Sequence, residues 1–366
     1  MRPAPLVGTV VVAGVGLLGG SIAVGARARF VADRVVGLDP DGEALEVASF
    51  HGVIDEARVA PGPWLADADL VVLAAPTGSL ARLARELAPF LRADAVVTDV
   101  GSVKGDVVAD LADVPDLRFV GGHPMAGSDR AGVANADAAL LENAVWVLTP
   151  TEATDADALA RVRAFVEALG ARPLELAPER HDRLVARVSH VPYLAALALT
   201  RLAADDDDRD ALMLLAAGGF RDLTRVASGS PVMSRDMVRG NAGAVRAALA
   251  DLRAELDALE ADLEDREALL AHAEHAKRTR DGIPVVRRGV LPPRPEVVLA
   301  VPDRPGELAR ITAACGEAGV NLKEIEVLAI REAGGAVRLA FEDPAALDAA
   351  VEALRAAGYE ARPRAT

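Results

Sequence analysis

A glycine-rich turn near the start of the chain constrains the fold more than any other feature. Gly14 to Gly19 reads G-V-G-L-L-G, directly after a Val-rich run and directly before an Ala-rich helical segment. In such a turn the first glycine permits a tight bend, the second lets the backbone approach a pyrophosphate, and the third lets helix pack on strand. Free N–H groups at the helix start attract phosphate. A tight turn without a ligand is the alternative, but strand, glycines and helix together predict a dinucleotide site at Gly14, Gly16, Leu17, Leu18 and Gly19.

An acidic residue ends the next predicted strand and favours one dinucleotide. Asp39 lies about 20 residues after the glycine turn, where a carboxylate accepts hydrogen bonds from a ribose 2′-hydroxyl and repels a 2′-phosphate. The sequence therefore predicts NAD as the cofactor, in preference to NADP.

Short apolar runs separated by helix-sized segments continue to about residue 177. This pattern is typical of strands that are buried on both faces of a parallel sheet. Residues 1–177 are therefore expected to form a doubly wound, Rossmann-type α/β domain, with strands at Thr9 to Ala13, Val35 to Asp39, Leu70 to Ala75, Val96 to Asp99, Arg118 to Gly121 and Val145 to Leu148.

Three further segments follow the sheet domain. Residues 178–280 have a helical pattern, 281–295 are rich in Gly and Pro as linkers are, and 296–366 alternate as βαββαβ, a ferredoxin-like unit. Within the helical segment, apolar residues recur at spacings of 4 and 3, which indicates a helix seam, either inside one chain or between two subunits. The seam residues are Val245, Leu249, Leu252, Leu256, Leu259 and Leu263.

Charge and cysteine content exclude several classes of partner. The 55 acidic and 40 basic residues give a net charge of −15, which opposes binding to nucleic acid or to an anionic membrane surface. No apolar run is long enough for a transmembrane helix. The single Cys315 cannot form an intrachain disulfide, and no Cys/His cluster has zinc-ligand spacing, so no metal is expected. A reducing cytoplasm fits this composition.

Polar residues follow three of the predicted strands, at the sheet edge where α/β proteins bind ligands. Ala75-Pro76-Thr77 follows one strand and is expected beside the cofactor. Ser102 and Lys104 follow the next and could bind a substrate hydroxyl or supply positive charge, or else cap a helix or lie on the surface. His123, in Gly-Gly-His-Pro, is a candidate general base, because an imidazole exchanges protons near neutral pH; a hydrogen-bonded loop histidine is the alternative.

The helical segment adds candidates for binding an anionic substrate. Arg221 or Arg225, after a double glycine, could bind a carboxylate bidentately, the alternative being ordinary ion pairs with nearby Asp. His181, Ser189, His190 and Tyr193 are expected on one helix, with the two histidines on different faces, so that a metal pair is not predicted.

These motifs, in this order, resemble the prephenate/arogenate dehydrogenase family. The segments are G-V-G-L-L-G-G-S, D-V-G-S-V-K, G-G-H-P-M-A-G, V-S-H-V-P and G-F-R-D-L-T-R, and the C-terminal V-P-D-R-P-G-E-L with G-V-N-L resembles an ACT domain. The resemblance implies an NAD-dependent enzyme of tyrosine biosynthesis. Such an enzyme oxidises a cyclohexadienol, and loss of CO2 makes the ring aromatic.

The resemblance also implies roles for individual residues. His123 would accept the proton of the 4-hydroxyl, Ser102 would orient that hydroxyl and the imidazole, and Arg225 would hold a substrate carboxylate. The remaining substrate pocket would include Lys104, His190, Tyr193, Ser128 and Asp129. A homodimer through the helical domain is implied, and tyrosine is the expected effector of the ACT domain, near Asp303, Pro305, Gly306 and Asn321.

The sequence departs from the family pattern in ways that concern the substrate side chain. Tyr193 stands where prephenate enzymes often carry a second histidine, Ser234 where some carry tryptophan, and Asp129 where many carry glutamate. Prephenate dehydrogenase is the expectation, and arogenate dehydrogenase is the nearest alternative. A β-hydroxyacid dehydrogenase would need a catalytic lysine and leaves H-P-M-A-G unexplained. A non-catalytic dinucleotide and amino-acid sensor would not need a base.

Overall fold

The computed structural model describes residues 5–127, 131–283, 295–302, 304–331 and 334–364, and it divides into two compact units, Met1–Arg288 and Gly289–Thr366. The first unit holds both the sheet and the helical segment that the sequence predicts. Most of the expected linker, residues 284–294, lies outside the described residues. Among the described helices, none combines the length and the apolar character needed to cross a membrane.

The first unit is built on an eight-stranded sheet in the order β3-β2-β1-β4-β5-β6-β7-β8. The first six of these strands in the chain pair in parallel, as expected. Strand β7 runs antiparallel to β6, and β8 is parallel to β7. The strands are β1 Val7–Ala13, β2 Ala32–Leu38, β3 Glu56–Arg58, β4 Leu70–Leu73, β5 Val96–Asp99, β6 Arg118–Pro124, β7 Val145–Thr149 and β8 Arg172–Glu175.

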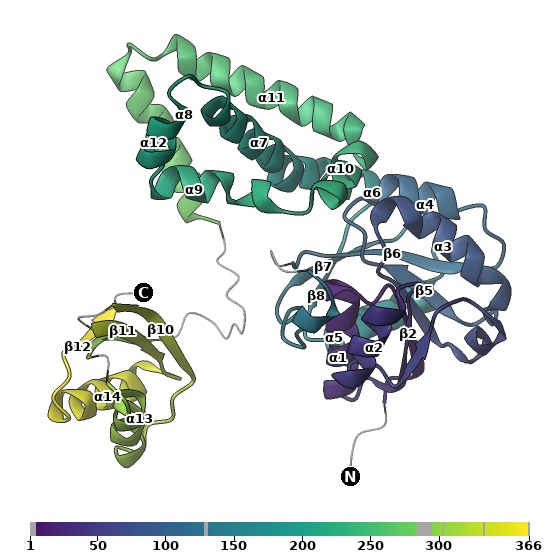
Figure 1. Ribbon diagram of the computed structural model, residues 1–366, viewed down its shortest axis with the longest axis horizontal. Helices are drawn as coiled ribbons and strands as arrows, with labels where there is room; N and C mark the ends of the chain where they lie inside the picture. Colours follow the sequence, from purple (N-terminus) through teal and green to yellow (C-terminus); the bar gives the residue numbers. More distant parts are fainter. Residues whose placement is uncertain (1–4, 128–130, 284–294, 303, 332–333, 365–366) are drawn as a thin grey trace. The chain divides into compact units, whose positions relative to one another are not determined.

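Helices cover both faces of the sheet (Figure 1). Residues of β1 alternate between two cores, because successive side chains of a strand point to opposite faces. Val10 and Val12 pack in the core with α1, α2 and α5, while Val11 and Ala13 pack in the core with α3 and α4. This is the doubly wound architecture that the sequence predicts. The helices are α1 Leu17–Ala28, α2 Gly42–Phe50, α3 Leu80–Leu87, α4 Gly105–Leu111 and α5 Ala156–Ala168.

Three features of the sheet differ from the expectation. The reversal at β7 was not predicted, since an apolar run does not reveal its direction. Strands β3 and β8 were missed because both lie at sheet edges and carry half-buried or exposed polar residues rather than an apolar run. These two edge strands lengthen the sheet without changing its class.

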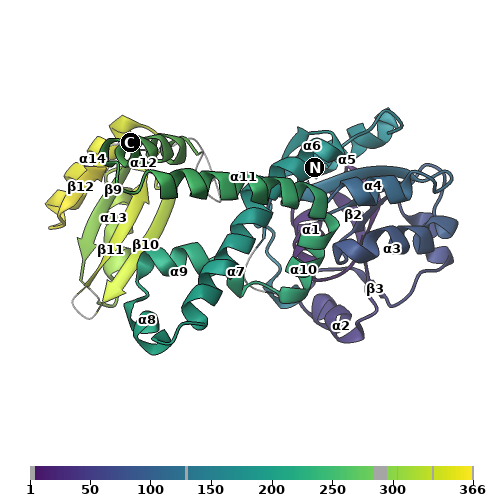
Figure 2. The same ribbon diagram turned by 90° about the horizontal axis from the view of Figure 1, so that it is seen from above.

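The helical segment packs α7, Val191–Ala204, alongside the long helix α11, Ala242–Ala261 (Figures 1 and 2). Leading into α7, a π-helical turn covers Ala186–His190. Pro192 lacks the N–H that would continue the helical ladder and therefore favours such a turn. The other helices are α6 Pro178–Val185, α8 Arg209–Leu215, α9 Gly218–Thr224, α10 Pro231–Gly240 and α12 Arg266–Asp281.

The predicted leucine seam of this segment is buried at one end only. Val245 is 3% exposed and packs against Ala186 and Val191, whereas Leu256 is 54% and Leu263 64% exposed. The far half of the seam is therefore not covered by the described part of this chain.

The second unit has the predicted ferredoxin-like order. Its antiparallel sheet reads β10-β11-β9-β12, and its core includes Val297, Leu299, Ile311 and Leu354. The elements are β9 Glu296–Val301, α13 Glu307–Glu317, β10 Glu324–Arg331, β11 Gly334–Ala340, α14 Pro344–Ala356 and β12 Ala361–Arg364.

Candidate active site

The glycine turn has the geometry of a phosphate-binding turn. Gly14 has φ +106°, and a Cβ atom there would lie 2.5 Å from the carbonyl oxygen of Ala74. A Cβ atom on Gly19 would lie 1.9 Å from the carbonyl oxygen of Gly14, so helix and strand are in close contact. A Cβ atom on Gly16 meets no described atom within 4 Å. Space in front of Gly16, at the start of α1, is what a pyrophosphate requires.

Asp39 is fixed beside this turn. Its carboxylate accepts hydrogen bonds from the N–H of Val15 at 2.7 Å and of Asp41 at 2.9 Å. Leu17 and Leu18 form the first turn of α1, and β4, which leads to Ala75, Pro76 and Thr77, pairs with β1. The structure thus brings the predicted cofactor residues to one edge of the sheet, and they fit an NAD molecule.

His123 lies within strand β6, not in a loop after it. The strand pairs with β5 up to Val120 and then with β7 from Gly121 to Pro124. The two glycines before His123 are closely packed and leave no space for a side chain. A Cβ atom on Gly122 would lie 2.6 Å from the carbonyl oxygen of Asp99, so these glycines allow close strand packing. His123 is therefore held rigidly from both sides.

A buried ion pair at the end of β5 contacts the backbone next to His123. The Lys104 ammonium donates to the Asp99 carboxylate and to the carbonyl oxygen of Gly122, and both charged side chains are 0% exposed. Asp99 also accepts the N–H groups of Gly101 at 2.8 Å and of Gly122 at 2.9 Å. Burial lowers the pKa of the Lys104 amine, and the Asp99 carboxylate opposes this change. The sequence predicts that Lys104 lines the substrate pocket. The structure instead places its side chain in the interior, paired with Asp99.

The imidazole of His123 contacts a second histidine, His181. Nδ1 of His123 lies 2.8 Å from Nε2 of His181, and Nδ1 of His181 lies 2.7 Å from Oδ1 of Asp182. The two rings are nearly perpendicular, at 77°. Asp182 also accepts the N–H groups of Lys104 at 2.9 Å and of Gly105 at 2.8 Å. Asp182 therefore joins α6 to the start of α4.

His190 belongs to the same cluster. Asn241, at the start of α11, donates from Nδ2 to the carbonyl oxygen of Asp182 at 2.7 Å and lies 3.3 Å from Nδ1 of His190. His181 and His190 are 0% and 1% exposed, so both face the interior. The sequence placed them on different faces of one helix, but the π-helical turn between them changes the rotation per residue.

Burial favours the neutral form of the imidazoles of His123 and His190. Desolvation, together with His181, Lys104 and His190, holds the pKa of His123 well below its usual value of 6.5. Burial also lowers the pKa of His190, to about 4. A neutral imidazole has one nitrogen lone pair, so His123 is able to accept a proton at neutral pH.

The other predicted substrate residues are more dispersed. Ser102 is half-buried in the loop after β5, and Tyr193 is half-buried in α7. Arg225 begins the short helical turn Arg225–Ser228 and is exposed, and its side chain makes no hydrogen bond or ion pair with another described residue. Ser128 and Asp129 lie outside the described residues. In the second unit, Pro305, Gly306 and Asn321 are exposed, Gly306 has φ +88°, and Asp303 is not described.

Sequence reasoning missed the partners of His123. His181, Asp182, Asn241 and Asp99 become recognisable only when α6 and α11 are packed against the loop after β5. The adjacent pair His181-Asp182 was the one available signal, since an imidazole next to a carboxylate is held in one tautomer.

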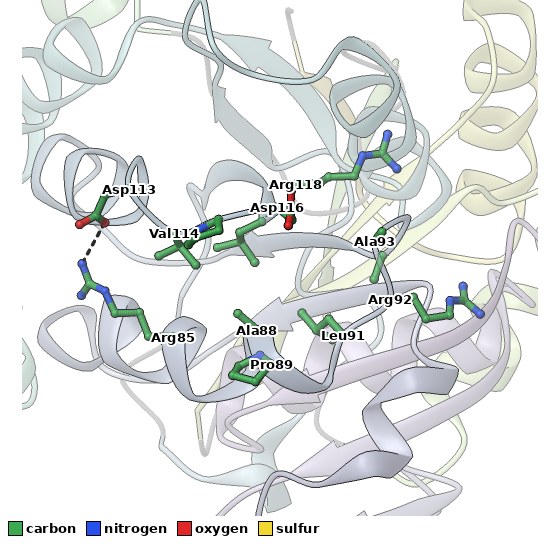
Figure 3. A pocket seen from close by; sticks show the side chains of 13 residues that line it. Arg85, Ala88, Pro89, Leu91, Arg92, Ala93, Asp113, Val114, Asp116 and Arg118 are labelled. Carbon is green, nitrogen blue, oxygen red and sulfur yellow. Dashed lines mark hydrogen bonds and ion pairs between the residues drawn. The ribbon is translucent and has the colours of Figure 1, made fainter.

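A separate hollow of about 540 Å³ lies before β5 and β6, at their amino ends (Figure 3). Its three arginines are already paired with carboxylates: Arg85 with Asp113, Arg92 with Asp69, and Arg118 with Asp155. Ligands of parallel sheets bind at the carboxyl ends, so this hollow does not belong to the site of His123.

A dinucleotide turn and a half-buried, neutral imidazole at one sheet edge suit the removal of a hydride and a proton from an alcohol. Comparisons with known proteins agree with this chemistry. Residues 22–175 match the family described as prephenate dehydrogenase, nucleotide-binding domain, residues 177–274 match its dimerization domain, and residues 296–358 match the ACT domain.

Individual relatives cover nearly the whole chain or about three quarters of it. Prephenate dehydrogenase of Bacillus subtilis (strain 168) is 34% identical over 342 residues, covering 91% of this chain and 92% of the relative. The crystal structure of prephenate dehydrogenase from A. aeolicus with hydroxyphenyl propionate and NAD+ is 34% identical, with a TM-score of 0.72 over 76% of this chain and 98% of that chain. Synechocystis arogenate dehydrogenase is 33% identical, with a TM-score of 0.65 over 75% and 98%.

Proposed function

The chain belongs to the prephenate dehydrogenase family, and from this premise we propose that it converts prephenate to 4-hydroxyphenylpyruvate with NAD. NAD, when bound, accepts the hydride from the carbon that bears the 4-hydroxyl. The observation that carries the proposal is His123, a neutral imidazole on a strand whose end lies at the same sheet edge as the glycine turn.

The protein's own residues have three tasks in this reaction. His123 accepts the proton of the 4-hydroxyl while hydride leaves the same carbon. The ring carboxylate then leaves as CO2, its bonding electrons complete the aromatic ring as a phenolate, and the proton held by His123 returns to the phenolate oxygen. Ser102 orients the hydroxyl toward the imidazole, and Gly16 and Asp39 hold the pyrophosphate and ribose of NAD, which is consistent with their geometry.

The first test is the formation of reduced nicotinamide by the purified protein with prephenate or arogenate, each with NAD or NADP. Prephenate with NAD should give the highest rate. A higher rate with arogenate would show that Tyr193 and its neighbours recognise an amino group. NAD binding without turnover of either substrate would favour the non-catalytic sensor instead.

The role of His123 is tested by H123N. Loss of the base should lower kcat by about 10²- to 10⁴-fold, the range that general bases contribute. The Kd for NAD should stay within about twofold, because His123 lies outside the glycine turn. Unchanged turnover would contradict the assignment.

We also propose that Arg225 binds a substrate carboxylate. Its guanidinium is exposed and has no carboxylate partner among the described residues, so it is available to an anion. R225A should raise the KM for prephenate strongly and change kcat less. R221A tests the other candidate arginine of this segment, and an equal or larger rise in KM in R221A would contradict the role of Arg225.

We also propose that the second unit binds tyrosine. The protein is further proposed to be a homodimer that works in the cytoplasm. The left-handed Gly306 at the start of α13 and the exposed Asn321 are the expected contacts. Added tyrosine should change the rate in the intact chain and should not do so in N321A. If tyrosine changes neither the rate nor the Tm of the intact chain, the effector assignment fails.

A further inference from the structure

The side chains of His123, His181 and Asp182 form a hydrogen-bonded chain with a defined direction. The Asp182 carboxylate receives two backbone N–H groups and the His181 ring. Burial raises the pKa of Asp182, but these hydrogen bonds outweigh it and the net shift is downward. An ionised carboxylate only accepts hydrogen bonds, so Nδ1 of His181 carries a proton.

The next link in the chain follows from the orientation of the His181 ring. This ring is 0% exposed, it faces the imidazole of His123, and the buried ammonium of Lys104 lies in the same cluster. Because Nδ1 of His181 donates to Asp182, Nε2 is the ring nitrogen that faces His123 and offers it a lone pair. That lone pair lies 2.8 Å from Nδ1 of His123 and accepts its proton.

We propose that His181 and Asp182 are positioning residues that keep the ring proton of His123 on Nδ1, so that Nε2 presents its lone pair to the substrate hydroxyl. The role in catalysis rests on the proposed function, whereas the tautomer does not. Among the described residues, no hydrogen bond occupies Nε2 of His123, and the residue is half-buried. Nε2 is thus the ring nitrogen left for the substrate, and it is the one that this tautomer makes basic.

The same chain responds when His123 takes up a proton. The imidazolium that forms donates a stronger bond to His181, and His181 is already polarised by Asp182. The titratable groups around His123 are His181 and Asp182 on α6, Lys104 after β5 and His190 before α7. Asp182 is the negative one, and it stabilises the transition state more than the ground state. Loss of the chain should therefore lower kcat and leave KM nearly unchanged.

The tautomer is measured directly by NMR of protein that carries ¹⁵N-labelled histidine. The chain has 6 histidines, so the His123 signals are assigned by comparison with H123N. We expect a protonated Nδ1 and an unprotonated Nε2 in the wild type, and an increase of the Nε2-protonated form in H181A. A wild-type His123 with its proton on Nε2, or the same tautomer in H181A, would overturn the proposal.

The kinetic test compares H181A and H181Q with H272A as the matched control. His272 also contacts an aspartate, with its Nε2 3.0 Å from Oδ2 of Asp262. It lies on α12, outside the His123 cluster. H181A should lower kcat by about 10- to 100-fold, less than loss of the base itself, with KM values within about twofold.

H181Q should recover most of this loss, because a Gln side-chain oxygen can accept the bond from His123. H272A should behave like the wild type. Equal kinetics of H181A and H272A would contradict the positioning role. If even the wild type shows no turnover, the proposed function fails, while NMR still decides the tautomer. Tm and the Kd for NAD establish that each variant is folded.

Discussion

At the scale of single residues, the most consequential contact is the buried ion pair of Lys104 and Asp99. Because the Lys104 ammonium is the cation paired with the buried Asp99, K104M leaves an uncompensated carboxylate in the interior. We expect K104M to lower the free energy of unfolding by about 3–5 kcal/mol, as measured by urea denaturation. K277M removes an exposed partner of Asp281 and should cost less than about 1 kcal/mol. Equal costs would refute the importance of the buried pair.

His190 makes stability depend on pH. Its pKa is about 4 in the folded protein and 6.5 ordinarily, so the unfolded chain binds the proton more tightly. Stability is therefore complete above pH 6.5 and decreases as the pH falls toward 4, by about 3 kcal/mol from this residue. His123 contributes in the same direction. H190Q should show a flatter decrease of unfolding free energy over this pH window. An identical pH profile in wild type and H190Q would be evidence against the lowered pKa.

At the scale of elements, the turn between β1 and α1 separates two roles of glycine. G14A forces a Cβ atom against the Ala74 carbonyl at a positive φ, so it should lower both Tm and NAD affinity. G16A meets open space, so it should keep Tm within a few degrees and still weaken NAD binding by occupying the position of a phosphate. Thermal melts and NAD titration of the two variants test this, and parallel losses of Tm would contradict it.

The elements that sequence predicts well are those with strong local signals. The glycine turn, the buried apolar strands and the order of the second unit carry such signals, and they were recognised with nearly their observed bounds. The reversal of β7, the edge strands and the π-helical turn depend on tertiary packing, which no local pattern records. For the same reason His123 was predicted while its partners His181 and Asp182 were not: their contact joins two segments that lie 58 residues apart.

At the scale of the whole molecule, the uncovered apolar residues of the helical segment require an explanation. Leu215, Leu223, Leu256 and Leu263 are all more than half exposed, and the matching family segment is described as a dimerization domain. We expect a dimer that covers them, so L256K should shift the sedimentation behaviour toward the monomer. F50K changes an 87% exposed residue on the sheet domain and should leave the dimer intact. A dimer that persists in L256K would place the interface elsewhere.

Strand β6 changes partners midway, from β5 to the reversed β7, just before it reaches His123. A shift of one residue in either pairing would turn the imidazole to the opposite face of the sheet. Inserting or deleting one residue in this stretch would therefore displace the imidazole. A change of length in the connections on either side would leave both strand pairings, and with them the position of His123, in place.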